Sequence, residues 1–172
     1  MSLDAAFVFT DAVSFKTFHS ERVYLLIIGL NAAPPHIALI FNDTYYSATV
    51  TGFERKKIGK DFLLRLSKKR ALALIELKSL KSQNTPDSIF QAYGPLSIGS
   101  SCLSPINDFI KENYNINWNR PFVHGLLDAL YEHGLVVEVQ ICGAPPESAS
   151  IPTYGQDSID SHIMQLKVSL NP

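Results

Sequence analysis

Three apolar runs of strand length, separated by short breaks, constrain the fold of this chain more than any other feature. Residues 23–28 (VYLLII) are continuously apolar and partly β-branched, as expected of a strand covered on both faces. The segment 31–35 ends this run, since its two prolines cannot donate to a β-ladder. A second run, residues 36–41, follows at once, and the turn residues 42–43 separate it from a third at 45–50. The pattern predicts a β-hairpin within a buried sheet.

The rest of the chain predicts helices in the middle and strands again at the end. Because strands come first, helices cluster and strands return, the order favours an α+β fold, with an antiparallel sheet packed against a few helices, over a doubly wound parallel sheet. Residues 143–161, rich in Pro, Ser and Ala, predict a long loop or lid. Helices are predicted at 60–70, from Thr85-Pro86 to about Gly94, from about 102 to 110 and at 121–133, and strands at 71–77, 135–141 and 162–168.

Composition narrows the class of protein. A length of 172 residues suits a single domain spanning 1–172, and 46% hydrophobic against 18% charged residues suits a compact globule. A net charge of −1 gives no global attraction to nucleic acid or membrane. No apolar run reaches membrane-spanning length, and the first residues lack the layout of a signal peptide. Two cysteines are too few for a disulfide framework and fit either a reducing compartment or a functional thiol, so a cytoplasmic location is favoured unless a signal peptide has been removed.

Cys102 is the first candidate for chemistry. It follows Gly99-Ser100-Ser101 and opens an amphipathic segment, so a helix N-terminus there would favour its thiolate. Pro105 leaves two possible starts: a helix from Ser101 or Cys102, or one capped by Ser104. A buried structural cysteine is the alternative interpretation, because cysteine packs as a small hydrophobe.

His36 is the candidate base for that thiol. It begins an apolar strand directly after two prolines. If Asn42-Asp43 is a two-residue turn, cross-strand partners have numbers that sum to 85, which sets His36 opposite Thr49 and near Ser47 on one face. Thr49, or Ser47 diagonally, would then orient the imidazole. The alternative is a strand-terminal histidine bonded to a backbone carbonyl.

The other motifs carry less chemistry. His124 and His133 are nine residues apart, so they do not form a helical metal pair, and no metal or nucleotide motif is present. We therefore expect no cofactor. Eight of the fifteen basic residues fall within residues 55–70, which indicates either the solvated face of a short helix or a site for an anionic partner. The residues predicted to bind an anion are Arg55, Lys56, Lys57 and Lys60.

The order of these motifs resembles the circularly permuted members of the NlpC/P60 (papain-like) superfamily, in which a histidine strand precedes a cysteine helix. The resemblance rests on residues 35–41 (PHIALIF), 45–49 (YYSAT), 62–66 (FLLRL), 71–75 (ALALI) and 101–109 (SCLSPINDF), within roughly residues 20–115. Two features depart from the family pattern: the second strand carries only hydroxyls at the orienting position, and Pro105 lies at the helix start.

The resemblance implies a nucleophilic Cys102, a His36 base and a third position at Ser47 or Thr49. It implies a permuted papain-like fold and a thiol-dependent hydrolase or acyltransferase acting on an amide or ester. The implied substrates are peptides, peptidoglycan fragments or acyl compounds, with no clear role for nucleic acid. A non-catalytic binding or structural module on the same scaffold, with the basic cluster at 55–70 serving an anionic partner, is the alternative.

Overall fold

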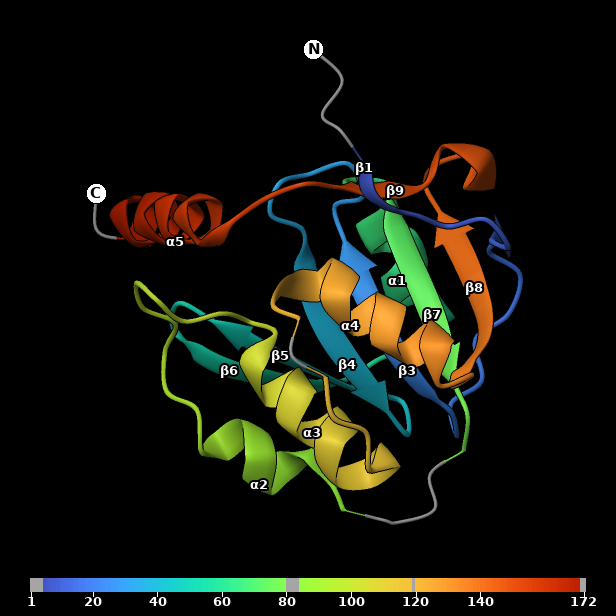
Figure 1. Cartoon of the computed structure of the whole chain (residues 1–172), viewed down its shortest axis with the longest axis horizontal. Coiled ribbons are helices and arrows are strands. Elements are labelled where there is room, and N and C mark those ends of the chain that lie inside the picture. The colour runs from blue at the N-terminus through green and yellow to red at the C-terminus, as the bar shows by residue number, and fades with distance from the viewer. Residues whose placement is uncertain (1–4, 80–83, 119, 171–172) are drawn as a thin grey trace.

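The fold is built around one large sheet. A computed structural model describes residues 5–79, 84–118 and 120–170. Within them, the sheet has seven strands in the order β2-β8-β7-β3-β4-β5-β6 (Figure 1). They are β2 (Val13–Ser14), β3 (Val23–Ile28), β4 (His36–Phe41), β5 (Thr44–Thr49), β6 (Gly52–Lys57), β7 (Leu72–Leu77) and β8 (Val136–Cys142).

The sheet is mixed, which corrects one part of the expected fold. Its neighbouring strands are antiparallel except β2 and β8, which run parallel. A separate two-stranded antiparallel sheet pairs β1 (Ala5–Val8) with β9 (Ser150–Pro152). The α+β class is confirmed, whereas the wholly antiparallel sheet is wrong because the short N-terminal strand β2 adds to the edge in the parallel sense.

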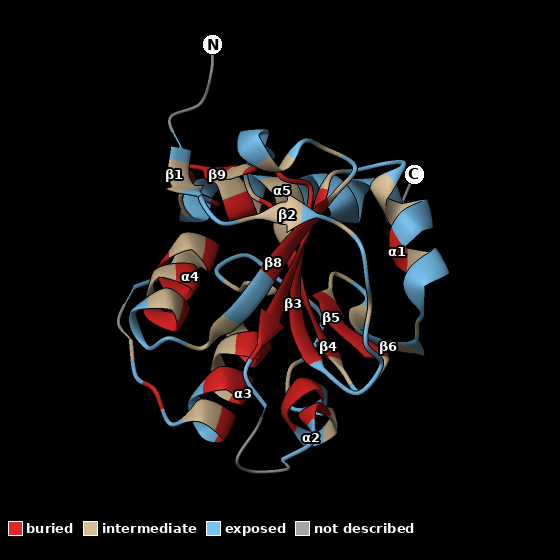
Figure 2. Ribbon diagram, turned by 90° about the vertical axis from the view of Figure 1, so that its right-hand side faces the viewer, coloured by how far each residue is buried: buried red, intermediate tan, exposed pale blue. Residues whose placement is uncertain are grey.

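Helices cover the large sheet on both faces (Figure 2). On one face lies α1 (Lys60–Ser67), and on the other lie α2 (Pro86–Gln91), α3 (Ser104–Tyr114) and α4 (Phe122–Glu132). The last helix, α5 (Gln156–Leu170), follows β9 at one end of the sheet. A single 3₁₀ turn, Pro146–Ser148, precedes β9.

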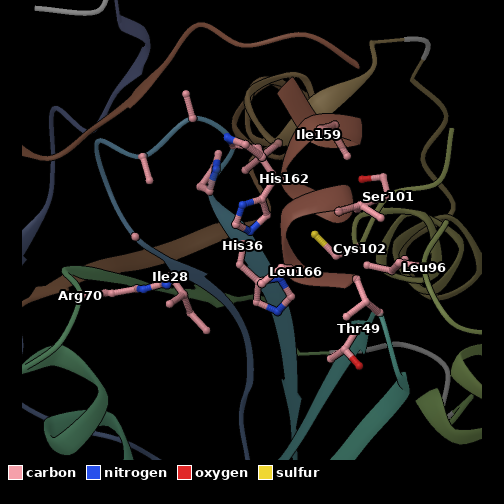
Figure 3. Close-up of a pocket in the computed structure, with 18 of the residues that line it drawn as sticks. Ile28, His36, Thr49, Arg70, Leu96, Ser101, Cys102, Ile159, His162 and Leu166 are labelled. Atoms are coloured by element: carbon pink, nitrogen blue, oxygen red, sulfur yellow. The ribbon is translucent and has the colours of Figure 1, made fainter. Parts of the chain in front are cut away.

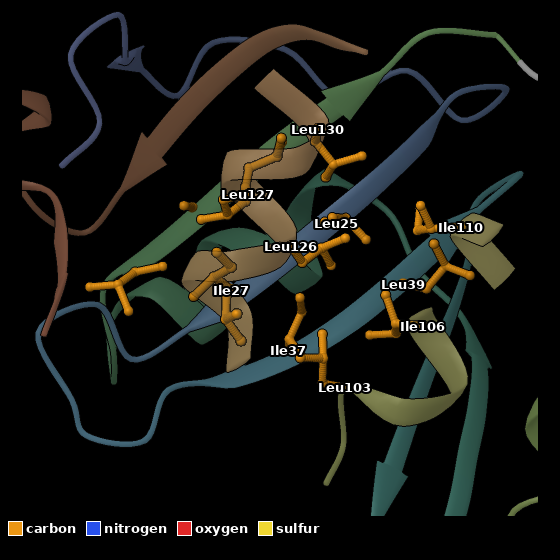
Figure 4. Close-up of a cluster of buried hydrophobic side chains, with 14 of the residues drawn as sticks. Leu25, Ile27, Ile37, Leu39, Leu103, Ile106, Ile110, Leu126, Leu127 and Leu130 are labelled. Carbon is orange, nitrogen blue, oxygen red and sulfur yellow. The ribbon is translucent and has the colours of Figure 1, made fainter. Parts of the chain in front are cut away.

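The buried hydrophobic side chains form two clusters, one on each face of the sheet. They meet at the central strand β3, all of whose residues are buried. Leu25 and Ile27 pack with Ile106 of α3 and Leu126 of α4 in the larger cluster (Figure 4). The alternate residues of β3 pack in a smaller cluster with Leu63 of α1. A strand covered on both faces explains why residues 23–28 lack the polar alternation of a half-exposed strand.

Most sequence-predicted elements are confirmed, but the C-terminal region is not. The predicted strand at 162–168 is wrong, since these residues lie in α5. Met164, Leu166 and Val168 alternate with polar residues and so imitate a strand, while the helix is fixed by burial of Ile159 and Ile163, four residues apart. The predicted long loop at 143–161 is also wrong, because it contains a 3₁₀ turn, β9 and the start of α5.

Candidate functional site

The β4–β5 hairpin follows the predicted register at its closed end. Asn42 and Asp43 have positive φ angles of 46° and 60°, as a two-residue hairpin turn of the primed type requires. The paired residues are Phe41 with Thr44, Ile40 with Tyr45 and Leu39 with Tyr46, and each pair sums to 85. The register prediction is therefore confirmed over the three pairs nearest the turn.

The same hairpin opens at its other end. The ladder between β4 and β5 stops at Leu39, so the residues before it no longer pair with β5. Ladder bonding alternates along a strand, and the pair flanking a two-residue turn is hydrogen-bonded, so the N–H of Ile37 points into this opening. On the β5 side, the Leu96 N–H donates to the Thr49 carbonyl at 2.9 Å. The loop before α3 therefore enters where the two strands separate.

His36 is oriented by a hydroxyl at this opening. Its Nε2 lies 2.7 Å from the Oγ of Ser47, which is almost wholly buried at 1% exposure. Of the two hydroxyls that the register offered, Ser47 contacts the ring, whereas Thr49 Oγ1 donates to the Gly52 carbonyl at 2.7 Å. Because Nε2 is engaged with Ser47, Nδ1 is the ring nitrogen left to exchange a proton with another group.

Burial keeps the imidazole neutral. Burial, together with smaller contributions from the nearby His162 and Arg70, which disfavour a second positive charge, lowers the pKa of His36 from 6.5 to about 4. Above about pH 5 the ring is therefore in its neutral form. A neutral imidazole with one free nitrogen is able to accept a proton.

Cys102 lies just before α3 rather than inside it. The helix begins at Ser104 with Pro105 in its first turn and Leu103 as its N-cap, so it starts one residue before the predicted Ser104-capped start and well after a start at Ser101 or Cys102. The segment packs against the larger core cluster, where Leu103 is buried. The thiol thus lies outside the first helical turn, which weakens the effect of the helix dipole on it.

The surroundings of the thiol act on its pKa in opposite directions. Burial is the largest influence and raises the pKa of Cys102 above its ordinary value. Hydrogen bonds from the backbone of Ile37, from the backbone of Cys102 itself and from the Ser101 side chain lower it in part. Without substrate, Cys102 is therefore a protonated thiol. The expectation that a helix N-terminus stabilises its thiolate is not met by this geometry.

The strand opening brings Cys102 next to the residue that follows His36. The bond from the Ile37 backbone to the Cys102 sulfur joins the loop before α3 to the start of β4. Among the described residues, no hydrogen bond joins the thiol directly to the imidazole. Both side chains line one pocket, shown in Figure 3, and catalytic bonds of this kind are often longer before substrate binds.

The pocket has a volume of about 840 Å³ and is mostly apolar. Its walls come from residues 28–36, the end of β5, the end of α1, the loop before α3 and one face of α5. Volumes of this order accommodate a small organic ligand. The pocket lies where β4 and β5 separate, which links the shape of the site to the break in the ladder.

Three polar residues of the pocket were not predicted from sequence. Tyr154 accepts a hydrogen bond from the Val123 N–H at 2.9 Å, and its pKa is raised to about 12 by burial. His162 extends from α5 toward the pocket, and Arg70 lines the opposite wall. Tyr154 and His162 were missed because their region was assigned to a loop and a strand. Arg70 was counted in a charge cluster without regard to its neighbours.

The predicted anion-binding residues are engaged with the protein itself. Arg55 pairs with Asp87 at 2.8 Å and Lys56 with Glu54 at 2.6 Å. Lys57 pairs with Asp43, and Lys60 donates to the Lys16 carbonyl at 3.0 Å. The first three lie on β6 rather than on a helix face. Cations already paired with carboxylates are poorly placed to hold an anionic partner.

Comparison with known proteins adds no family assignment. No protein-family model matches the chain, and neither a curated protein nor a solved structure is significantly similar to it. In the described ranges, no helix has the length and apolar character needed to cross a membrane. The same part of the chain holds no group of three or more His, Cys, Asp or Glu residues placed to bind a metal ion.

Proposed function

We propose that this protein is a thiol-dependent hydrolase or acyltransferase that acts on an amide or ester bond, with Cys102 as nucleophile and His36 as base. The observation that carries the proposal is the shared pocket. It contains a thiol, a neutral imidazole oriented by Ser47, and the backbone bond from Ile37 that holds the thiol beside the start of β4. Nucleophile, base and orienting group are the parts that covalent acyl transfer requires.

The chemistry begins from a neutral pair. His36 takes the proton of the Cys102 thiol as the sulfur attacks the substrate carbonyl, and the imidazolium then gives that proton to the leaving amine or alcohol. The product of this step is a thioester on Cys102. Water completes a hydrolysis, or a second alcohol or amine completes a transfer, with His36 removing the proton of the incoming group.

Two further groups assist these steps. Ser47, bonded to Nε2, fixes the ring so that Nδ1 exchanges the proton. The backbone N–H of Cys102 is the proposed donor to the negative charge that develops on the carbonyl oxygen. Because the pKa of His36 is about 4, the base remains unprotonated in weakly acidic solution, and we expect activity to extend to about pH 5.

Acylation by an activated ester tests the proposal. We expect p-nitrophenyl acetate to leave one acetyl group on the chain, located on Cys102 by peptide mass spectrometry. Cys102→Ala removes this adduct, whereas the matched control Cys142→Ala keeps it, since Cys142 lies at the end of β8 and does not line the pocket. An adduct found equally on both cysteines, or on neither, would overturn the proposal.

A non-catalytic binding module is the second candidate, favoured by the burial that raises the pKa of the Cys102 thiol. A protonated, buried thiol reacts slowly unless a base assists it. The two candidates differ in the effect of His36→Ala. An enzyme loses acylation of Cys102 in that variant, while in a binding module any slow background labelling of the thiol stays the same.

A further inference from the structure

One wall of the pocket carries a single charge. Arg70 is exposed and lines the pocket, and among the described residues that line it no Asp, Glu, Lys or other Arg occurs. No ion pair or side-chain hydrogen bond of the described residues engages its guanidinium. An arginine without a carboxylate, beside an apolar pocket, favours a ligand that brings its own anion.

Arg70 lies on the His36 side of the pocket. Its charge acts on His36 but is not among the influences on the thiol of Cys102. Figure 3 shows Arg70 beside Ile28, with His36 between it and Cys102. In the proposed reaction His36 delivers a proton to the leaving group, so an anion held by Arg70 belongs to the leaving group rather than to the acyl group.

Across the pocket from Arg70, helix α5 presents an apolar stripe. Ile159, Ile163, Leu166 and Leu170 recur at helical spacing and line the pocket. The last two are 40% and 54% exposed, so they present apolar surface into the open part of the pocket. Burial of this surface by an aliphatic chain is favourable, at about 25 cal/mol per Å².

A peptide fits these walls poorly. Its backbone N–H and C=O groups would enter a pocket whose surface is mostly apolar, and each of these groups left without a hydrogen-bond partner costs free energy. An aliphatic chain carries no such groups. Of the substrates that the resemblance implies, which are peptides, peptidoglycan fragments and acyl compounds, the acyl compounds match the apolar pocket best.

We propose that the pocket binds a compound in which a long aliphatic acyl group is joined, through the scissile amide or ester bond, to a small leaving group that carries a carboxylate. N-acyl amino acids are the simplest members of this class. The chain lies along α5 and the carboxylate pairs with Arg70. This inference rests on the proposed function for the position of the scissile bond. Attack by Cys102 breaks the carbonyl–nitrogen bond, and the amino acid leaves with the proton from His36. Water then releases the fatty acid from the thioester.

Binding to the Cys102→Ala variant tests the inference separately from catalysis. We expect calorimetry to detect N-dodecanoylglycine below its micellar concentration, and its methyl ester to bind at least tenfold more weakly because the carboxylate is blocked. N-acetylglycine, which lacks the chain, is expected to show no measurable binding. These results need no turnover, so failure of the acylation experiment and failure of this one are distinguishable.

Two matched pairs of variants assign the contacts. Arg70→Gln should weaken N-dodecanoylglycine about tenfold and leave the methyl ester unchanged, while Lys69→Gln, next to it but outside the pocket, changes neither. Leu166→Ser with Leu170→Ser should weaken the long-chain ligand at least tenfold. The control is Met164→Ser with Val168→Ser, which are exposed on the same helix but do not line the pocket.

Several results would overturn the inference. Equal affinity for the acid and its methyl ester removes the role of Arg70. Equal affinity for the dodecanoyl and acetyl compounds removes the chain site, as does an equal loss in the Met164 and Val168 control. Circular dichroism on each variant verifies the fold, and the unchanged methyl-ester affinity of Arg70→Gln verifies that its pocket is intact.

Discussion

The two ends of the β4–β5 hairpin differ in what they contribute. At the turn end, the strands are paired from Leu39 to Phe41, and a two-residue turn closes them. At the other end the ladder is absent, and His36, Ser47 and the Ile37 N–H face an opening into which the loop of Cys102 packs. One pair of strands thus supplies a rigid, fully bonded half and a half with backbone and side-chain groups free for other partners.

This difference shows how the paired half of the hairpin holds the candidate site in place. The paired half fixes the direction of β4, so the ring of His36 starts from a strand anchored on both sides by β3 and β5. The open half exposes one backbone donor and one imidazole side by side. Changes at the open end are therefore expected to alter chemistry, and changes at the paired end to alter stability.

The largest expected effect is at the open end. His36→Gln removes the proton acceptor, and we expect the rate of Cys102 acylation by p-nitrophenyl acetate to fall by about 10²–10⁴-fold, the usual contribution of general base catalysis. The control is His133→Gln, because His133 contacts the Ala129 carbonyl on α4 at 2.8 Å and does not line the pocket. A loss below threefold in His36→Gln would remove the chemical distinction between the two ends.

The paired end is tested by Leu39→Ala. Leu39 is fully buried in the larger core cluster, and its truncation leaves a cavity that should lower the free energy of unfolding by about 2–5 kcal/mol. Urea denaturation measures the loss. Acylation of Cys102 per folded molecule should stay within twofold of the parent, and a large fall in that rate at unchanged stability would contradict the comparison.

The hairpin also shows what sequence reasoning can reach. The apolar run at 36–41, the turn residues Asn42-Asp43 and strand alternation were enough to predict the register, because these are local properties of two adjacent strands. They also put Ser47 and Thr49 on the face of His36. The choice between them required coordinates, since it depends on the backbone separating beyond Leu39 and on Thr49 bonding to Gly52.

The parts that sequence did not predict depend on contacts distant along the chain. The stripe of α5 is recognisable only when Ile159 and Ile163 are read together at helical spacing, whereas the strand prediction at 162–168 left out Ile159 and counted Ile163 as part of a strand. Arg70 and His162 are 92 positions apart in the numbering, yet both act on His36. The charge run at 55–70 likewise divides into paired cations on β6 and an arginine in the pocket, which no local pattern separates.

The partly buried imidazole of His36 should make stability depend on pH. The pKa of His36 is about 4 in the fold, against 6.5 for an exposed ring, so between these values the unfolded chain binds a proton that the folded chain does not. The stability that the fold has with a neutral His36 is therefore fully present above pH 6.5 and is lost as the pH falls toward 4. We expect the unfolding free energy to drop by about 2–3 kcal/mol more in the parent than in His36→Gln between pH 7 and 4.5.

Urea denaturation of both proteins at the two pH values isolates this effect, because the carboxylates that also titrate there are shared and cancel in the difference. An equal pH dependence in parent and variant would mean that the ring is hydrated in the fold. His36 at the open end would then behave like a solvent-exposed histidine, and the two ends of the hairpin would not differ in electrostatics.

The smallest expected effect separates the two hydroxyls of β5. Ser47→Ala removes the partner of His36 Nε2 but leaves the base in place, so we expect about a tenfold loss in the acylation rate, comparable to one hydrogen bond of about 1–1.5 kcal/mol. Thr49 lines the pocket, and Thr49→Val removes its hydroxyl bonds to Gly52 and Thr51 but leaves the Ser47–His36 bond intact, so the rate should stay within twofold. Equal losses in the two variants would mean that general disturbance of β5, rather than orientation of the ring, lowers the rate. A loss confined to Ser47→Ala would show that, of two hydroxyls only two residues apart at the open end of β5, only the one bonded to His36 affects the reaction.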